Sequence, residues 1–116
     1  MSPAELDELR RSLETIRVEI EELLDISREG AAPVALDTSI GRLTRVDALQ
    51  QQSMAQANIR ASEIRLRQVV AAQGRLERGA YGECLGCGEP IAIARLRVRP
   101  EATLCLECQD ARERRA

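Results

Sequence analysis

The sequence Cys84-Leu85-Gly86-Cys87, followed after 17 intervening residues by Cys105-Leu106-Glu107-Cys108, decides the fold of the C-terminal third of this chain. Two C-x-x-C motifs at this separation are typical of a four-thiolate zinc site, in which each motif supplies two sulfur ligands. Gly86 and Gly88 stand where a chain that curls around a metal needs a positive φ or a close backbone approach. We therefore predict one structural Zn²⁺ bound by Cys84, Cys87, Cys105 and Cys108.

Two other uses of the cysteines have less support. Disulfides form in oxidising compartments, and residues 1–10 are too highly charged to be the apolar core of a signal peptide. A redox C-x-x-C centre uses one pair on a βαβ scaffold, of which the sequence has no sign. The chain contains no histidine, and four protein ligands leave no open position for a catalytic water. We predict that the protein is not an enzyme and has no catalytic residues.

The composition favours long helices over a large globular core. Tyr81 is the only aromatic residue, charged residues make up 31% of the chain, and the apolar residues are mostly Leu, Ile, Val and Ala. No apolar run approaches the roughly 20 residues that span a bilayer. We expect a mainly α, soluble, cytoplasmic protein without membrane association, whose C-terminal third is stabilised by its metal.

The first 30 residues predict one long helix that pairs with another. Ser2, Pro3 and Glu5 form a helix start, with a cap, a proline in the first turn and a capping-box carboxylate. Apolar residues then recur at spacings of three and four: Leu6, Leu9, Leu13, Ile16, Ile20 and Leu23. So narrow a stripe suits a single partner helix. We predict a helix over 4–29 that enters a coiled coil.

A turn over 30–38 and a second helix over 39–78 are predicted next. Gly30 and Pro33 break the first helix, and cap candidates occur at residues 37–39 or, with a later start, at Thr44. Gly79 ends the second helix. Its apolar stripe is less regular than that of the first helix, because Gln50 and Gln68 interrupt it. The residues that can share one face are Leu43, Val46, Met54, Ala57, Ala61 and Ile64.

The distribution of charge predicts that the two helices lie antiparallel within one chain. Residues 1–29 have nine acidic and four basic side chains, and residues 30–80 have four acidic and seven basic ones. Exposed ion pairs contribute little energy, so the apolar seam would provide the binding and the charges would select the register. The alternatives are two solvated charged faces, and pairing of the N-terminal helices between two chains. A monomer is favoured, with residues 1–78 as the hairpin and 79–116 as the zinc finger and C-terminal helix.

The finger region contains three closely spaced arginines, Arg95, Arg97 and Arg99. A zinc ion with four thiolates has a net charge near −2, which nearby arginines and backbone N–H groups offset. This explanation is preferred over nucleic-acid contact. Residues 91–96 have the pattern of a short helix, and the chain reads as helical again from Cys105.

The finger resembles a known family over about 30 residues. The shared pattern is Tyr81-Gly82-x-Cys84-x-x-Cys87-Gly88-x-x-Ile91-x-x-x-Arg95-Leu96-x-Val98-x-Pro100-x-Ala102-x-x-Cys105-x-x-Cys108-Gln109. It is similar to the zinc finger of the DksA/TraR family of bacterial transcription regulators. In that family a helical hairpin precedes the finger, and its end enters the secondary channel of RNA polymerase. The resemblance implies direct binding to RNA polymerase without sequence-specific DNA binding, and some relatives act together with ppGpp.

The hairpin end departs from the family pattern. Well-known members have an acidic motif D-x-x-D-x-A, whereas here Asp37 and Asp47 are ten residues apart, with Arg42 and Arg45 between them. The resemblance makes these four residues the candidate polymerase contacts. The local alternative is that the two aspartates only cap helices and the arginines are solvated. Two functions stay open: a polymerase-binding regulator, and a zinc-stabilised coiled-coil adaptor for another protein partner with no direct effect on transcription.

Overall fold

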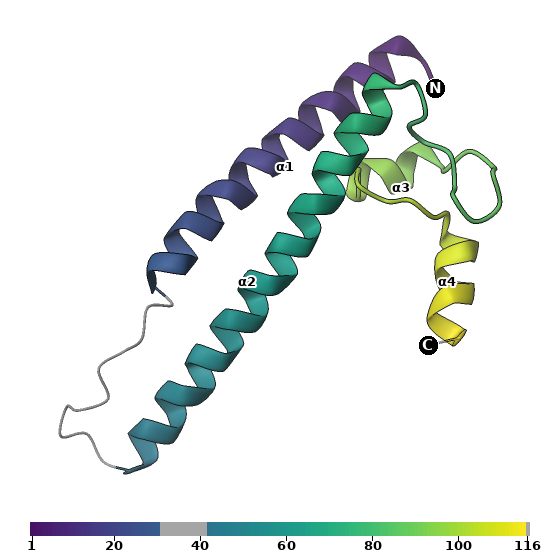
Figure 1. The fold of residues 1–116 in the computed structure, drawn as a ribbon. Helices are drawn as coiled ribbons and strands as arrows, with labels where there is room; N and C mark the ends of the chain where they lie inside the picture. Colours follow the sequence, from purple (N-terminus) through teal and green to yellow (C-terminus); the bar gives the residue numbers. More distant parts are fainter. Residues whose placement is uncertain (31–41, 116) are drawn as a thin grey trace.

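The protein folds into two long antiparallel helices with a small globular finger at one end (Figure 1). The structure is a computed structural model that describes residues 1–30 and 42–115. Helix α1 runs over Pro3–Gly30, α2 over Arg42–Glu77, α3 over Ile93–Val98 and α4 over Leu106–Arg115. This confirms the predicted fold class, a helical hairpin followed by a four-cysteine module and a short C-terminal helix.

Helix α1 begins with the predicted capping box. The Oγ atom of Ser2 accepts a hydrogen bond of 3.1 Å from the N–H of Glu5, and Oε1 of Glu5 accepts one of 2.9 Å from the N–H of Ser2. These bonds satisfy two donors that have no partner in the first turn of a helix. The N–H of Ser2 also lowers the pKa of the Glu5 carboxyl, because it stabilises the charged form.

The seam of α1 follows the predicted stripe except at its last residue. Leu9, Leu13 and Ile20 are buried, but Leu23 is 52% exposed and Leu24 is 2% exposed. The prediction of Leu23 was wrong because it continued a spacing of 3.5 residues per turn. From Leu6 to Leu24 is 18 residues, about five turns of a straight helix with 3.6 residues per turn, so Leu24 returns to the same face.

Helix α2 packs on α1 with a different face from the predicted one. The residues that face α1 recur at heptad-like spacing: Ile59, Leu66, Val69, Ala72 and Leu76. In the predicted set, Val46, Met54 and Ile64 are 50%, 67% and 49% exposed, Ala57 and Ala61 are also exposed, and the Leu43 side chain lies outside the described part. The true seam was missed because polar residues interrupt it.

One of these polar residues, Gln73, makes hydrogen bonds across the seam. Its side-chain oxygen accepts a bond of 3.0 Å from Nη1 of Arg17, and its Nε2 donates one of 2.9 Å to Oε2 of Glu14. Both partners are on α1. A glutamine at this position therefore links the helices through neutral and charged groups, which an apolar pattern does not reveal.

The predicted pairing of an acidic α1 with a basic α2 is not the pairing observed. Among the described residues, the one ion pair between these helices joins Nη2 of Arg28 on α1 to Oε1 of Glu63 on α2, at 3.9 Å. Both side chains are substantially exposed, so the pair contributes little energy. Apolar packing sets the register.

Helix α2 overhangs α1. Arg28, two residues from the end of α1, lies beside Glu63, which is 21 residues into α2. The first part of α2 thus extends about 25 Å beyond α1 at about 1.5 Å per residue, and Figure 1 shows its free end far from the finger.

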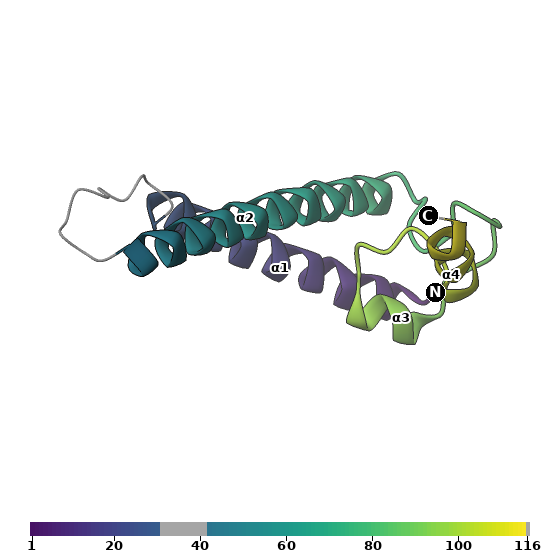
Figure 2. The same cartoon turned by 90° about the horizontal axis from the view of Figure 1, so that it is seen from below.

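The finger begins at a sharp stop of α2. Gly79 has φ 71°, its N–H bonds to the carbonyl of Leu76, and the N–H of Ala80 bonds to the carbonyl of Arg75 at 2.8 Å. This is a Schellman motif, which favours glycine at the left-handed position. The finger then folds back against the two helices near the N-terminus (Figure 2). None of the described helices is long and apolar enough to cross a membrane.

Candidate metal centre

The four cysteines converge although they come from two distant segments. Cys84 and Cys87 lie in the loop after α2, Cys105 directly precedes α4, and Cys108 is in its first turn. Their four Sγ atoms all lie within 4.8 Å of one another, and Cys87 Sγ is 3.9 Å from Cys105 Sγ. Zinc–sulfur bonds of about 2.3 Å in a tetrahedron place sulfur atoms about 3.8 Å apart. The cluster therefore has the donor set and the size that suit one Zn²⁺.

Two glycines let the first C-x-x-C motif curl around this point. Gly88 has φ 78° and its N–H bonds to the carbonyl of Cys84 at 2.9 Å. At Gly86 an added Cβ would lie 3.0 Å from the Sγ of Cys108, so a side chain there would press on a sulfur of the other motif. The predicted roles of both glycines are confirmed, one through a positive φ and one through close approach.

Backbone donors surround the sulfur of Cys84. The N–H groups of Gly86 and Cys105 each point at it from 3.3 Å. The N–H of Cys105, followed by those of Cys87 and Gly86, lowers the pKa of Cys84 to about 6 because these donors stabilise a thiolate. The pKa of Cys108 is raised to about 12, first by its contact with Cys105. These shifts favour the thiolate at Cys84 and the thiol at Cys108. A bound cation would remove this difference between the sulfurs, because coordination favours the thiolate at each ligand.

Of the three finger arginines, only Arg95 serves the cysteine cluster. Its Nε donates a 2.8 Å hydrogen bond to the carbonyl of Leu104, the residue before Cys105. Arg97 instead reaches α1, where its Nε lies 2.9 Å from Oε2 of Glu8, and Arg99 is exposed. The expectation that all three neutralise the metal site was therefore wrong for Arg97, which attaches the finger to the hairpin.

A buried carboxylate, Glu101, makes the other main attachment. Its side chain is 2% exposed, and its Oε2 accepts a 2.7 Å charged hydrogen bond from Nε of Arg65 on α2. Beside it the hydroxyl of Tyr81 donates a 2.8 Å bond to the carbonyl of Pro100. Sequence reasoning missed Glu101, because glutamate is normally exposed and no local motif marks this one as buried.

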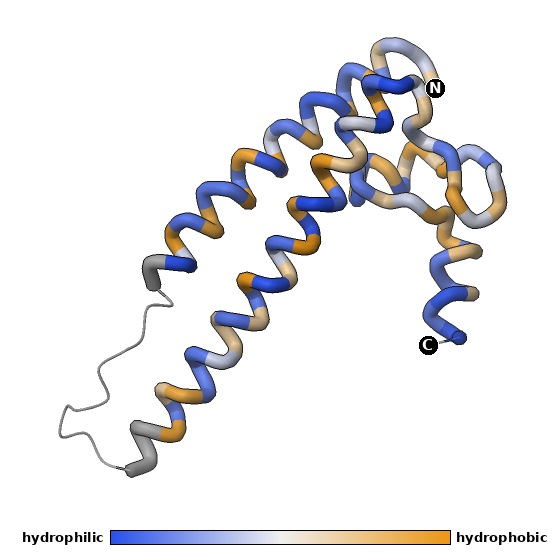
Figure 3. Tube along the Cα trace, viewed as in Figure 1, coloured by the Kyte–Doolittle hydropathy of each residue, from blue (hydrophilic) through white to orange (hydrophobic). Residues whose placement is uncertain are grey.

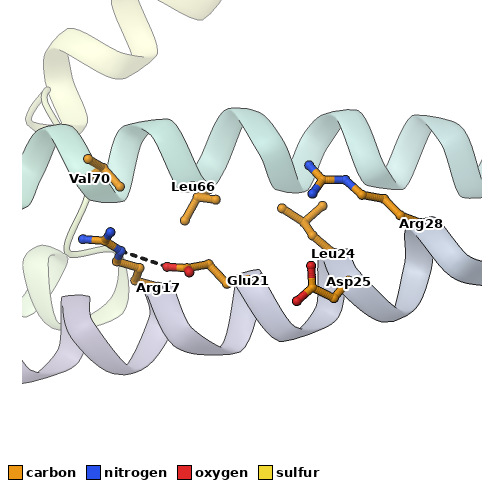
Figure 4. A pocket seen from close by; sticks show the side chains of 7 residues that line it. All are labelled: Arg17, Glu21, Leu24, Asp25, Arg28, Leu66 and Val70. Atoms are coloured by element: carbon orange, nitrogen blue, oxygen red, sulfur yellow. Dashed lines mark hydrogen bonds and ion pairs between the residues drawn. The ribbon is translucent and has the colours of Figure 1, made fainter.

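A groove between the hairpin helices lies away from the cysteines. It has a volume of about 370 Å³, and Figure 4 shows side chains from both helices around it. On its α1 side, Arg17 and Glu21 form an ion pair of 2.8 Å, one turn apart on the helix. The lining residues are Arg17, Glu21, Leu24, Asp25, Arg28, Leu66 and Val70.

The candidate partner-binding residues that belong to α2 lie at the other end of the described hairpin from the cysteines. Asp47 is exposed on α2, near its free end. Arg42 and Arg45 belong to the first turn of α2, but their side chains lie outside the described part, and so does Asp37 altogether.

Comparison with known proteins identifies the finger. Residues 79–114 match the family described as prokaryotic dksA/traR C4-type zinc finger. The RNA polymerase-binding transcription factor DksA of Caulobacter vibrioides is 54% identical over 41 residues, which are 35% of this chain and 29% of that protein. The protein of the same name from Haemophilus influenzae is 38% identical over 48 residues, 41% of this chain and 33% of that protein. The matched part spans only about a third of the length of these relatives.

A solved structure extends the likeness to the whole chain. The transcription factor DksA2 from Pseudomonas aeruginosa matches with a TM-score of 0.80 and 29% identity. The match covers 99% of this chain and 88% of that one. The similarity therefore includes the helical hairpin as well as the finger.

Proposed function

We propose that this chain, whose residues 79–114 are a DksA/TraR C4-type zinc finger on a DksA-like hairpin, binds RNA polymerase directly and regulates transcription. The observation that carries the proposal is the structural match to DksA2 over 99% of the chain. Two relatives that share the finger are named RNA polymerase-binding transcription factors. Fold alone does not define function, so the partner needs a direct test.

The finger acts in this proposal as a structural support. Cys84, Cys87, Cys105 and Cys108 hold one Zn²⁺, and the metal supplies rigidity, since four thiolates leave no position for a substrate. Arg97 and Glu101 then fix the finger to α1 and α2 through ion pairs of 2.9 and 2.7 Å. The base of the hairpin is thereby held in one orientation.

The free end of the hairpin is the proposed working surface, which enters the secondary channel of polymerase. Its overhang of α2 beyond α1 makes a narrow projection. The candidate contacts are Asp37, Arg42, Arg45 and Asp47. Asp47 is exposed, as a contact with a partner requires. We place the protein in the bacterial cytoplasm, where polymerase is found, and expect it to act as a monomer without sequence-specific DNA contacts.

Purified components test this function. The chain should bind core RNA polymerase with a measurable Kd and change the yield of transcripts in vitro, and parallel reactions with ppGpp would show whether the nucleotide acts with it. Asp47→Ala and Arg45→Ala should reduce the transcriptional effect while the helical content stays the same. If they act like the wild type, the two residues serve only their own helix.

The adaptor function is retained as a second candidate because of one sequence feature. Asp37 and Asp47 are ten residues apart with two arginines between them, so the paired carboxylates of the family pattern are missing. Binding to polymerase with no change in any transcript, or no binding at all, would favour the adaptor.

A further inference from the structure

One peptide unit of the finger joins an arginine to a cysteine sulfur. The carbonyl of Leu104 accepts a 2.8 Å hydrogen bond from Nε of Arg95. The N–H of the next residue, Cys105, points at Sγ of Cys84 from 3.3 Å. This carbonyl and this N–H belong to the same planar peptide unit and lie on its opposite edges. Arg95 and the sulfur of Cys84 are therefore linked through a single rigid group.

The same peptide unit joins the two C-x-x-C motifs. Cys84 opens the first motif and Cys105 opens the second. One residue earlier, the carbonyl of Thr103 accepts a 2.8 Å hydrogen bond from the N–H of Leu85. The segment that leads into the second motif is thus held against the first motif by backbone groups, and Arg95 adds a side-chain donor to these contacts.

Helix α3 places Arg95 beside the cysteines. Hydrophilic arginines stand between hydrophobic residues along this short helix (Figure 3). Leu96, the neighbour of Arg95, is completely buried and anchors the helix in the core. Arg95 itself is only partly exposed, and it lines a groove of about 320 Å³ together with Cys87 and Cys105. Its side chain is therefore held at the cysteine cluster.

The charge of Arg95 has no carboxylate partner among the described residues. The next arginine on α3, Arg97, is instead paired with Glu8. A charged donor makes a stronger hydrogen bond to a carbonyl than a neutral donor does. Because hydrogen bonds in a chain polarise one another, a strong bond at one edge of a peptide unit strengthens the bond at its other edge. Arg95 thus supports the contact between the N–H of Cys105 and the sulfur of Cys84.

We infer that Arg95 is a positioning residue for the metal. Through the Leu104–Cys105 peptide unit it aims a backbone N–H at the sulfur of Cys84 and fixes the second motif against the first. Groups that orient metal ligands typically raise the metal affinity by about ten- to a hundredfold. Arg95 accordingly raises the affinity of the chain for Zn²⁺ although it is not a ligand. This role concerns the metal centre alone and does not depend on the partner that the hairpin binds.

The test compares single substitutions in the full chain. Arg95→Met removes the charge and the donor at similar side-chain length. Arg99→Met removes the charge of an exposed arginine four residues further on and leaves the bond to Leu104 in place. Tyr81→Phe removes another 2.8 Å hydrogen bond from a side chain to a backbone carbonyl of the finger, that of Pro100. Zinc affinity is measured by competition with a chromophoric chelator, and circular dichroism checks the fold.

Arg95→Met should weaken Zn²⁺ binding by about ten- to a hundredfold, and both controls should stay within about fivefold of the wild type. Arg95→Lys keeps a positively charged donor that can reach the same carbonyl. Since this contact uses one N–H and not the planar fork of the guanidinium, the lysine variant should bind Zn²⁺ within about fivefold of the wild type.

Cobalt provides a readout that a general loss of finger stability would not move. At saturating Co²⁺, the sulfur-to-metal charge-transfer band of Arg95→Met should keep its intensity, because the same four cysteines bind. The band should shift to longer wavelength, because the sulfur of Cys84 has lost the support of its N–H donor. Tyr81→Phe and Arg99→Met should give the wild-type spectrum.

Unchanged zinc affinity in Arg95→Met would overturn the inference. Equal losses in Arg95→Met and Arg99→Met would show that positive charge acts without the hydrogen bond. Equal losses in Arg95→Met and Tyr81→Phe, with wild-type cobalt spectra, would show that Arg95 only stabilises the finger. A loss of about tenfold or more in Arg95→Lys would also contradict the inference, and this variant decides the matter if Arg95→Met does not fold.

Discussion

Arg65 of α2 and Glu101 of the finger lie 2.7 Å apart, Nε to Oε2, and the carboxylate is almost completely buried. The other oxygen of Glu101, Oε1, has no hydrogen-bond partner among the described residues. The guanidinium of Arg65 is therefore the group that offsets the cost of burying this charge in the described part of the chain. The attachment of the finger to the hairpin depends on a pair that sequence alone does not reveal.

We predict that Arg65→Ala destabilises the protein by about 1–3 kcal/mol, because it leaves Glu101 buried without its charged partner. The lower half of this range is expected, since the arginine itself is 43% exposed. Arg67→Ala, on the same helix and without an ion pair in the described part, is the matched control and should change the free energy of unfolding little. Equal losses in both variants would show that the pair has no special role.

The corrected seam predicts opposite results at two adjacent leucines. Leu24→Ala should cost about 2–4 kcal/mol in free energy of unfolding, because it opens a cavity at a residue that is 2% exposed. Leu23→Ala, at 52% exposure, should change stability by less than about 0.5 kcal/mol. Urea unfolding followed by circular dichroism measures both. A larger loss of stability at Leu23 than at Leu24 would support the strict heptad spacing and contradict the helix packing described above.

The burial of Tyr81 predicts that the protein loses stability at high pH. Burial raises its pKa from 10.0 to about 12, because the phenolate is poorly solvated inside the protein. Below pH 10 the hydroxyl is neutral in both states and has no effect. As pH rises from 10 to 12 the unfolded chain loses the proton and the folded chain keeps it, so stability falls.

Since Tyr81 is the only tyrosine, its ionisation can be followed directly by ultraviolet absorbance. The folded protein should titrate near pH 12 and the urea-unfolded chain near pH 10. Tyr81→Phe should abolish the decline between these values while costing about 1 kcal/mol at pH 8, through loss of the bond to Pro100. Titration near pH 10 in the folded state would mean that the ring is not buried.

Metal removal should unfold the finger and spare much of the hairpin. We expect one zinc per chain, and Cys84→Ser or a strong chelator should lower the protection of residues 79–115 against hydrogen exchange. Structural zinc contributes on the order of 10 kcal/mol to such modules, whereas α1 and α2 pack through their own seam. Full protection of the finger in metal-free protein, or two disulfides by mass spectrometry, would contradict this.

The structural features that could be predicted from the sequence are those set by residues close together in the chain. The capping box of Ser2 and Glu5, the stop at Gly79 and each of the two C-x-x-C motifs are set within a few residues, and the structure has each of them. The pairing face of α2 is not local. Its seam includes Gln73, and the predicted face contains Val46, Met54 and Ile64, which are exposed, so periodicity pointed to the wrong side.

The most direct test of the account asks which end of the chain reaches into polymerase. A photo-crosslinking amino acid replaces Asp47, at the free end of the hairpin, or, as the control, Asp110, which is exposed on α4 of the finger. Each protein is irradiated in complex with core RNA polymerase, and the crosslinked peptides are identified by mass spectrometry. The account predicts crosslinks from position 47 to residues that line the secondary channel, competed by excess unlabelled protein, and none of these from position 110. Stable binding with no channel crosslink from position 47 would contradict it.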